Sequence, residues 1–237
     1  MVGDFDPDSV KALIVAGLGS WKSPLPYLRI TSRPRTSAPL DVKLDTPDKA
    51  NAMFVAGKTL PLRDDSPDYP AMVLADYMLG GGFLNSRLAT RIRQKDGLSY
   101  GVGSFFNAAA TDTVAQWMSY AIYAPENREK LEQAFKEELE RAAKDGFTPE
   151  EITKAKEGWT QSAKLGRAND RALASRLGSN LFLGRRFARE AEVEGKVNAL
   201  TAAQLQAAVA TYLNPNSLAI VKAGDFNKKP PTEAPKP

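Results

Sequence analysis

The stretch GGGFLNSRLATRIRQKDGLSYGVGS, residues 80–104, decides the fold of this chain. Its glycines follow an apolar helical pattern, and residues 83–95 then read as a second, basic helix that ends in an Asp-Gly turn. Side chains alternate over residues 98–107, which predicts a strand. Residues 113–123 alternate as well, so we expect the two strands to pair as an antiparallel hairpin.

The alternation also assigns side chains to faces of the predicted sheet. The first strand is expected to show Leu98, Tyr100, Val102, Ser104 and Phe106 on one face. The second strand is expected to group Val114, Gln116, Met118, Tyr120 and Ile122 in the same way.

Helical and extended patterns are grouped along the rest of the chain. Further strands are expected at residues 40–44, 52–60 and 217–223, and capping boxes at Thr148 and Thr201 start helices. Local hairpins and grouped helices favour an α+β layered sandwich with helices on one face of a largely antiparallel sheet. We divide the chain into a leading helix and proline-rich connector (1–39), the α+β domain (40–226) and a disordered tail (227–237).

The composition excludes several classes of function. The 237 residues include no cysteine and no histidine, so disulfides, a thiol nucleophile and a Ser-His pair are excluded. Zinc sites draw mainly on these two residue types, and we therefore expect no zinc in this chain. Basic and acidic residues alternate along the helices, and the net charge is only +4, so nucleic-acid binding is not expected. No segment approaches the roughly 20 apolar residues of a membrane span.

The glycine run does not match a phosphate-binding motif. A Walker loop needs Gly-Lys-Ser/Thr after a strand, and a dinucleotide fingerprint needs GxGxxG after a strand. Here the glycines follow a helix. The helix amino-terminus after Gly82 could still attract an anion through free N–H groups. A binding module for an anionic ligand at Gly82 is therefore kept as one hypothesis, and it predicts an affinity that falls with salt.

The same stretch resembles a known family. The motifs that carry the resemblance are Gly80-Gly81-Gly82, Ser86-Arg87-Leu88, Ile92-Arg93 and Gly97-Leu98-Ser99-Tyr100-Gly101. Together they are similar to the carboxy-terminal, non-zinc domain of the pitrilysin/insulinase zinc metallopeptidases, the inverzincins, which include mitochondrial processing peptidase. The resemblance extends from Gly3-Asp4-Phe5 to Gly224-Asp225-Phe226.

The resemblance implies two catalytic residues. In this family two halves enclose a chamber, and one half carries the zinc motif HxxEH. The facing half contributes an arginine and a tyrosine seven residues apart, and Arg93 and Tyr100 match that spacing. They would bind the peptide and stabilise negative charge on the scissile carbonyl oxygen. Gly80, Gly81, Gly82 and Ser86 are the implied substrate-binding residues. The residues alone also allow Tyr100 as a packing residue and Arg93 as a surface charge.

HxxEH cannot occur in a chain without histidine. The resemblance therefore implies that zinc and the general base come from a partner domain or subunit, and that this chain alone is inactive. The abrupt start at Met1 favours the last domain of a longer zinc metalloendopeptidase. The alternative is a non-catalytic assembly or scaffold subunit of the same family. The peptide substrate and the compartment stay open, although bacterial relatives of this kind are often exported to the periplasm.

Overall fold

Five strands form one mixed sheet in the computed structural model, which describes residues 1–35 and 38–227. The strands are β1 (Leu40–Asp45), β2 (Ala52–Leu60), β3 (Ser99–Ala108), β4 (Ala115–Tyr123) and β5 (Ala219–Gly224). Their order across the sheet is β1-β5-β2-β4-β3, and the β1–β5 pair is parallel while the other pairs are antiparallel. The predicted, largely antiparallel sheet is thus confirmed, with β3 at one edge.

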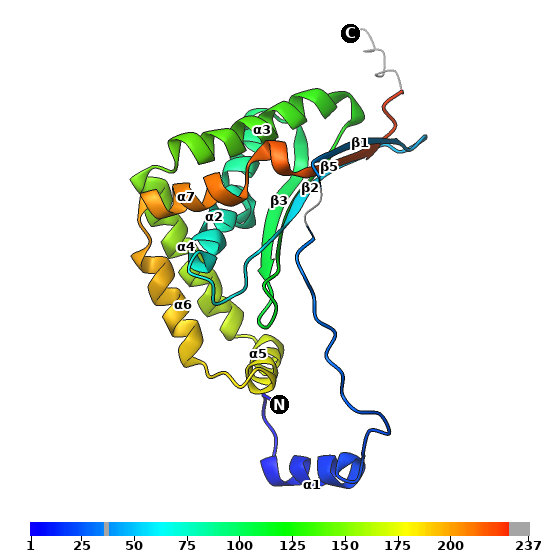
Figure 1. Ribbon diagram of the computed structural model, residues 1–237, viewed down its shortest axis with the longest axis vertical. Helices are drawn as coiled ribbons and strands as arrows, with labels where there is room; N and C mark the ends of the chain where they lie inside the picture. Colours follow the sequence, from blue (N-terminus) through cyan, green and yellow to red (C-terminus); the bar gives the residue numbers. More distant parts are fainter. Residues whose placement is uncertain (36–37, 228–237) are drawn as a thin grey trace, which may run out of the picture.

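Helices cover one face of this sheet (Figure 1). The α-helices are α1 (Pro7–Leu18), α2 (Tyr69–Asp76), α3 (Arg128–Asp145), α4 (Pro149–Arg167), α5 (Asp170–Phe182), α6 (Ala188–Ala199) and α7 (Ala202–Tyr212). Shorter helical segments are η1 (Tyr77–Gly81), η2 (Phe83–Asn85), η3 (Ala89–Lys95), η4 (Pro125–Asn127) and η5 (Pro215–Ser217). Helix α7 contacts both α2 and α3, and α2 also contacts β3. This arrangement confirms the α+β layered sandwich.

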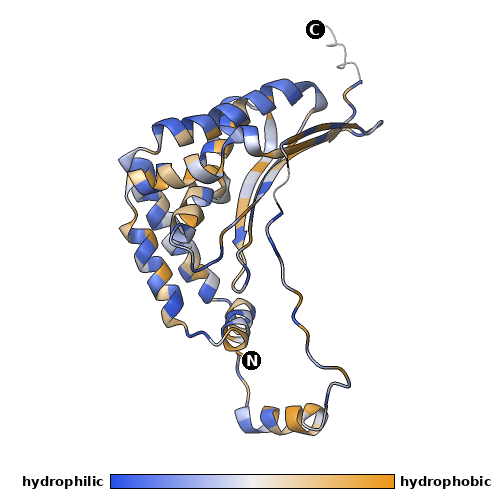
Figure 2. Cartoon of the chain, in the orientation of Figure 1, coloured by the Kyte–Doolittle hydropathy of each residue, from blue (hydrophilic) through white to orange (hydrophobic). Residues whose placement is uncertain are grey.

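The core lies between the helices and the sheet. Phe54 of β2 and Trp117 of β4 are fully buried, and both lie against Phe135 of α3. The ring centroids are 4.9 Å apart for Phe54–Phe135 and 6.5 Å apart for Trp117–Phe135. The predicted capping boxes at Thr148 and Thr201 are confirmed, and they start α4 and α7. Most residues of α3 are hydrophilic, as its mainly blue ribbon in Figure 2 shows.

The other face of the sheet carries mainly uncharged side chains. On β4 every second residue is buried against the helices, so Gln116, Met118, Tyr120 and Ile122 share the opposite face, as predicted. Met53 of β2 and Phe105 of β3 also remain exposed.

Helix α1 is joined to the sheet by a long connection. Asp6 caps the helix by accepting a hydrogen bond from Ser9 N at 2.7 Å. All residues of α1 are described, and none of them is buried. Figure 1 shows α1 set apart from the sheet at the end of an extended segment. That segment touches the β3–β4 turn, where Arg29 and Ser32 N both bind Asp112 at 2.8 Å. The division into three parts stays a prediction, and residues 228–237 of the predicted tail lie outside the described residues.

The structure differs from the predicted secondary structure in two places: one predicted helix is wrong and one observed helix was not predicted. Residues 83–95 are not one helix, because the 3-10 turn η2 ends at Ser86, whose backbone is extended at φ −83° and ψ 155°. A new helix begins after Ser86 and widens into the π-helical turn η3. Helix α6 was not predicted at all. Its only buried residue is Val197, so it lacks the apolar stripe by which a helix is found in a sequence.

Candidate active site

The chain from Gly80 to Gly101, called the site segment below, joins the buried helix α2 to the edge strand β3. Helix α2 continues directly into the π-helical turn η1, and a second π-helical turn, η3, comes shortly before β3. Such turns are rare and occur frequently at functional sites. Two of them within one segment mark it as a candidate site.

The three glycines of the site segment pack against the protein's own atoms. A Cβ atom would lie 2.5 Å from Ser104 N if added at Gly80, 2.8 Å from Asp76 Oδ2 at Gly81 and 2.6 Å from Tyr77 O at Gly82. Gly80 and Gly82 are buried, whereas Gly81 is exposed. The glycine run therefore allows η1 to approach β3 and the end of α2 closely.

Phe83 and Ser86 shape the turn that follows the glycines. Phe83 has a left-handed backbone with φ 54°, which is unusual for a bulky residue, and its side chain is 68% exposed. Strained residues of this kind cluster at functional sites. Ser86 is buried, and its hydroxyl donates to Phe83 O at 2.7 Å. The hydroxyl of Ser86 thus serves the turn itself.

Arg93 lies on η3 among side chains that fix this turn. Gln94 Nε2 donates to Leu84 O at 2.8 Å, and Arg91 binds both Asp96 at 2.6 Å and Glu137 at 3.1 Å. Arg93 itself is exposed and has no hydrogen-bond or ion-pair partner among residues 1–35 and 38–227. A free guanidinium is therefore held on a well-fixed stretch of backbone.

Tyr100 lies at a β-bulge in the edge strand. The register of β3 against β4 shifts between Ser99 and Gly101, and the extra residue is Tyr100. The Ser99 hydroxyl donates to Ile122 O at 2.6 Å and accepts from Gly101 N at 3.1 Å, which fixes the bulge. The Tyr100 side chain is 59% exposed. Its predicted place on the face of Val102, Ser104 and Phe106 is therefore wrong, because a bulge breaks the alternation.

The turn between η3 and β3 brings the neighbours of these two residues together. Leu98 N donates to Ile92 O at 2.8 Å, and Gly97 adopts the left-handed φ of 64° that the turn needs. Arg93 is the residue directly after Ile92, and Tyr100 comes two residues after Leu98. The site segment thus carries an exposed cation and an exposed phenol on either side of one tight turn.

A cavity that was not foreseen lies beside the site segment. It has a volume of about 660 Å³ and is lined by residues of η1, η2, η3 and α4. Three of its lining residues interact. Arg87 binds Glu151 through two nitrogens, each 2.8 Å from a carboxylate oxygen, and stacks 4.4 Å from the ring centroid of Phe147. The hydrogen bond from Arg87 lowers the pKa of Glu151 to about 2. This pair ties α4 to the site segment.

Replacing Glu151 with glutamine should loosen this tie. We expect Glu151→Gln to lower the free energy of unfolding by about 2 kcal/mol, because the Arg87 side chain, 10% exposed, loses its counter-charge. The effect is smaller than the pKa implies, since the Glu151 side chain is 36% exposed and water screens the pair. Urea unfolding at pH 7 measures it. Glu150→Gln is the matched control, because both Glu150 and its partner Lys154 are far more exposed, and it should change stability by less than about 0.5 kcal/mol.

The described residues do not fit a zinc site. Within residues 1–35 and 38–227, no group of three or more His, Cys, Asp or Glu side chains is arranged to hold a metal ion. None of the helices in these ranges has the length and apolar character that a membrane crossing requires.

Several solved structures share this fold. The peptidase M16 inactive domain from Pseudomonas fluorescens is 25% identical with a TM-score of 0.74, and the match covers 99% of this chain and 54% of that one. The inactive peptidase domain of a zinc protease homologue from Bordetella parapertussis is 22% identical with a TM-score of 0.60, covering 78% of this chain and 96% of that chain. A chain in complex III2 from Candida albicans with Inz-5 bound is 18% identical with a TM-score of 0.70, covering 94% and 53%.

These comparisons also define what this chain corresponds to. It spans about half the length of the Pseudomonas and Candida chains, at 54% and 53%. No curated protein matches it. The family model described as the peptidase M16 inactive domain matches residues 1–158, which include the whole site segment. The chain therefore belongs to the peptidase M16 inactive domain family.

Proposed function

We propose that this chain is the carboxy-terminal, non-zinc domain of an insulinase-like zinc metalloendopeptidase. In this proposal it closes the proteolytic chamber, while zinc and the general base lie on an HxxEH-bearing partner domain. Its own contribution is Arg93 and Tyr100, which donate hydrogen bonds to a bound peptide. The observation that carries the proposal is that both side chains are exposed, at either side of one fixed turn, and that Arg93 has no partner within the described ranges.

The chemistry of the pair fits peptide hydrolysis. Negative charge develops on the scissile carbonyl oxygen when the peptide bond is attacked, and fixed donors aimed at that oxygen stabilise the transition state. A guanidinium supplies a permanent positive charge and several N–H donors, and a phenol supplies one O–H donor. Fixing η3 and the bulge in advance removes the entropy loss of ordering these donors during the reaction.

The rest of the site segment supports the pair in this proposal. Gly81 of the glycine run and the strained, exposed Phe83 that follows the run are the residues that a peptide would contact. Gly80, Gly82 and Ser86 support the site indirectly, because their contacts inside the protein shape the turn.

The test replaces the two residues in the complete peptidase, assembled from this chain and its HxxEH-bearing partner. We expect Arg93→Ala and Tyr100→Phe each to lower kcat and kcat/KM together by roughly tenfold to a hundredfold. The expected loss lies at or below the lower end of the range of about a hundredfold to a thousandfold for such donors. Peptide cleavage is followed with a quenched fluorescent substrate.

Two exposed residues outside the site segment provide controls. Arg171→Ala on α5 and Tyr27→Phe in the connection to α1 make the same chemical changes elsewhere and should leave kcat unchanged. A rise in KM alone would show that Arg93 and Tyr100 bind the substrate and the transition state equally and do not speed the chemical step. If all four variants cleave like the parent, the proposal is wrong and the scaffold alternative is favoured.

A further inference from the structure

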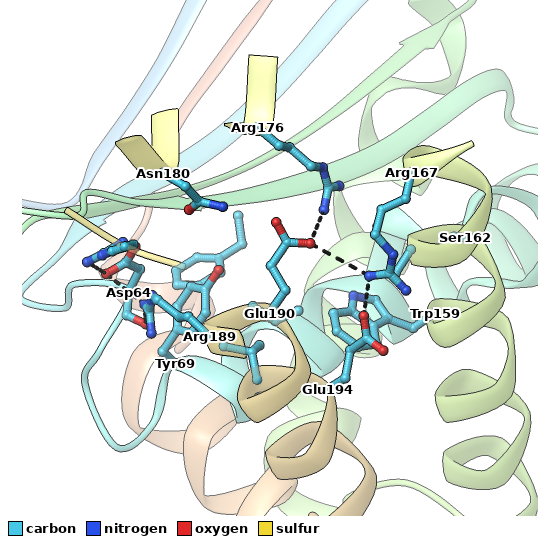
Figure 3. A pocket seen from close by; sticks show the side chains of 15 residues that line it. Asp64, Tyr69, Trp159, Ser162, Arg167, Arg176, Asn180, Arg189, Glu190 and Glu194 are labelled. Atoms are coloured by element: carbon cyan, nitrogen blue, oxygen red, sulfur yellow. Dashed lines mark hydrogen bonds and ion pairs between the residues drawn. The ribbon is translucent and has the colours of Figure 1, made fainter. Parts of the chain in front are cut away.

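A second cavity lies between α4, α5 and α6 (Figure 3). It has a volume of about 520 Å³. Phe106 lines it from β3, six residues after Tyr100, which corresponds to about 20 Å along a strand. This cavity is therefore separate from the proposed catalytic pair.

The floor of the cavity is aromatic. Phe106 and Tyr69 lie with their ring centroids 6.0 Å apart, and Trp159 of α4 lines the same cavity. All three rings belong to elements packed on the core rather than to mobile ends. A ligand that enters this space therefore meets a preformed apolar surface, as is usual for small-molecule sites.

The walls carry more positive than negative charge. Four arginines and three carboxylates line the cavity. The extra positive charge arises at Asp64, because this single carboxylate is paired with two arginines. Asp64 binds Arg185 at 2.5 Å and Arg189 at 3.0 Å. A net charge of one positive unit above an aromatic floor favours an anionic ligand with an apolar body.

Two donors on α5 point into this space. Arg176 and Asn180 are four residues apart and thus lie on the same side of the helix. Arg176 binds Glu190 through Nη1 at 2.8 Å, and its side chain is 40% exposed, so other N–H groups remain accessible. The Asn180 amide nitrogen is buried and has no hydrogen-bond partner among the described residues. Figure 3 shows the amide of Asn180 turned toward the interior of the cavity, with Arg176 on the same wall. A buried donor without an acceptor is rare in folded proteins.

We propose that this cavity binds a carboxylate carried beside an aromatic or large apolar group. The carboxylate accepts hydrogen bonds from Asn180 Nδ2 and from the free side of the Arg176 guanidinium, while the apolar group packs on Trp159 and Phe106. Two parts of a peptide have this chemistry, namely a free carboxy-terminal aromatic residue and an acidic side chain next to an aromatic one. The inference does not depend on the proposed function, since it concerns a different surface.

Calorimetric titration of the full chain tests the proposal. The probes are N-acetyl-phenylalanine, which carries a carboxylate, and N-acetyl-phenylalanine amide, which does not. We expect the acid to bind at least tenfold more tightly than the amide, and Asn180→Leu and Arg176→Gln each to weaken acid binding about tenfold. Arg171→Gln, on α5 and exposed, is the control and should leave the affinity unchanged. Urea unfolding of each variant checks that it folds.

Two peptides distinguish the sources of the carboxylate. One ends in a free phenylalanine, and the other contains an internal Glu-Phe pair and an amidated end. Preferential binding of either identifies the natural form of the ligand within the proposal. Equal affinity for acid and amide, no binding of the acid at millimolar concentration, or folded Asn180 and Arg176 variants that bind like the parent would each overturn the inference. None of these outcomes bears on Arg93 and Tyr100, which are tested by kcat.

Discussion

Gly80→Ala is expected to lower the free energy of unfolding by about 4 kcal/mol. The added Cβ would lie 2.5 Å from both the backbone nitrogen and the hydroxyl oxygen of Ser104. Ser104 belongs to β3, which is paired along its length with β4, so its backbone has little freedom to move. The new methyl group would also disturb the 2.6 Å hydrogen bond from the Ser104 hydroxyl to Asp76. Urea unfolding measures the loss as a lower midpoint with an unchanged slope.

Gly178→Ala is the matched control for this replacement. Gly178 is an exposed residue within α5, and no described atom lies within 4 Å of the position that its Cβ would take. Alanine is the better helix former, so this variant should gain about 0.5–1 kcal/mol. A Gly80→Ala protein within 1 kcal/mol of the parent would contradict the tight contact between η1 and β3.

Sequence reasoning succeeded where the controlling contacts are local. The alternation along β4 and the capping boxes at Thr148 and Thr201 depend on residues a few positions apart. The faces of β4 and the starts of α4 and α7 were therefore predicted correctly. Helix α6 was missed because its contacts are with other helices and it buries only Val197. Periodicity is weak evidence where a helix has no continuous apolar side.

The site segment shows why its geometry could not be predicted in the same way. The bulge at Tyr100 depends on a hydrogen bond between Ser99 and Ile122, which are 23 residues apart. The π-helical turn η1 depends on the contact of Gly80 with Ser104. A sequence can name Arg93 and Tyr100 by their spacing, but their exposure follows from these distant partners.

Asp76 should make the stability of this protein depend on pH in the direction opposite to that of most carboxylates. It ends α2 inside the core, where its Oδ1 accepts hydrogen bonds from Ser104 at 2.6 Å and from Trp117 at 2.9 Å. Burial outweighs these bonds and raises the pKa of Asp76 from 3.8 to about 6. The folded protein therefore holds this proton more tightly than the unfolded chain does. Its stabilising effect is complete below pH 3.8 and is lost as the pH rises through 6.

The loss amounts to about 3 kcal/mol over the whole range, of which about 2 kcal/mol falls between pH 4.5 and pH 7.5. Asp76→Asn removes the titration, and its Oδ1 can still accept from Ser104 and Trp117. The stability of this variant relative to the parent should therefore rise by about 2 kcal/mol from pH 4.5 to pH 7.5, as measured by urea unfolding at both values.

Glu151→Gln is the comparison for this pH dependence, because the pKa of Glu151 is lowered to about 2 by Arg87. The stabilisation from Glu151 is fully present above pH 4.5 and is lost only as the pH falls toward 2. The loss of unfolding free energy caused by Glu151→Gln should thus stay nearly constant between pH 4.5 and pH 7.5, the range in which the effect of Asp76→Asn changes. A difference between Asp76→Asn and the parent that is equally flat from pH 4.5 to pH 7.5 would mean that Asp76 is already ionised at the lower pH. The core between α2, β3 and β4 would then have to admit water to the carboxylate.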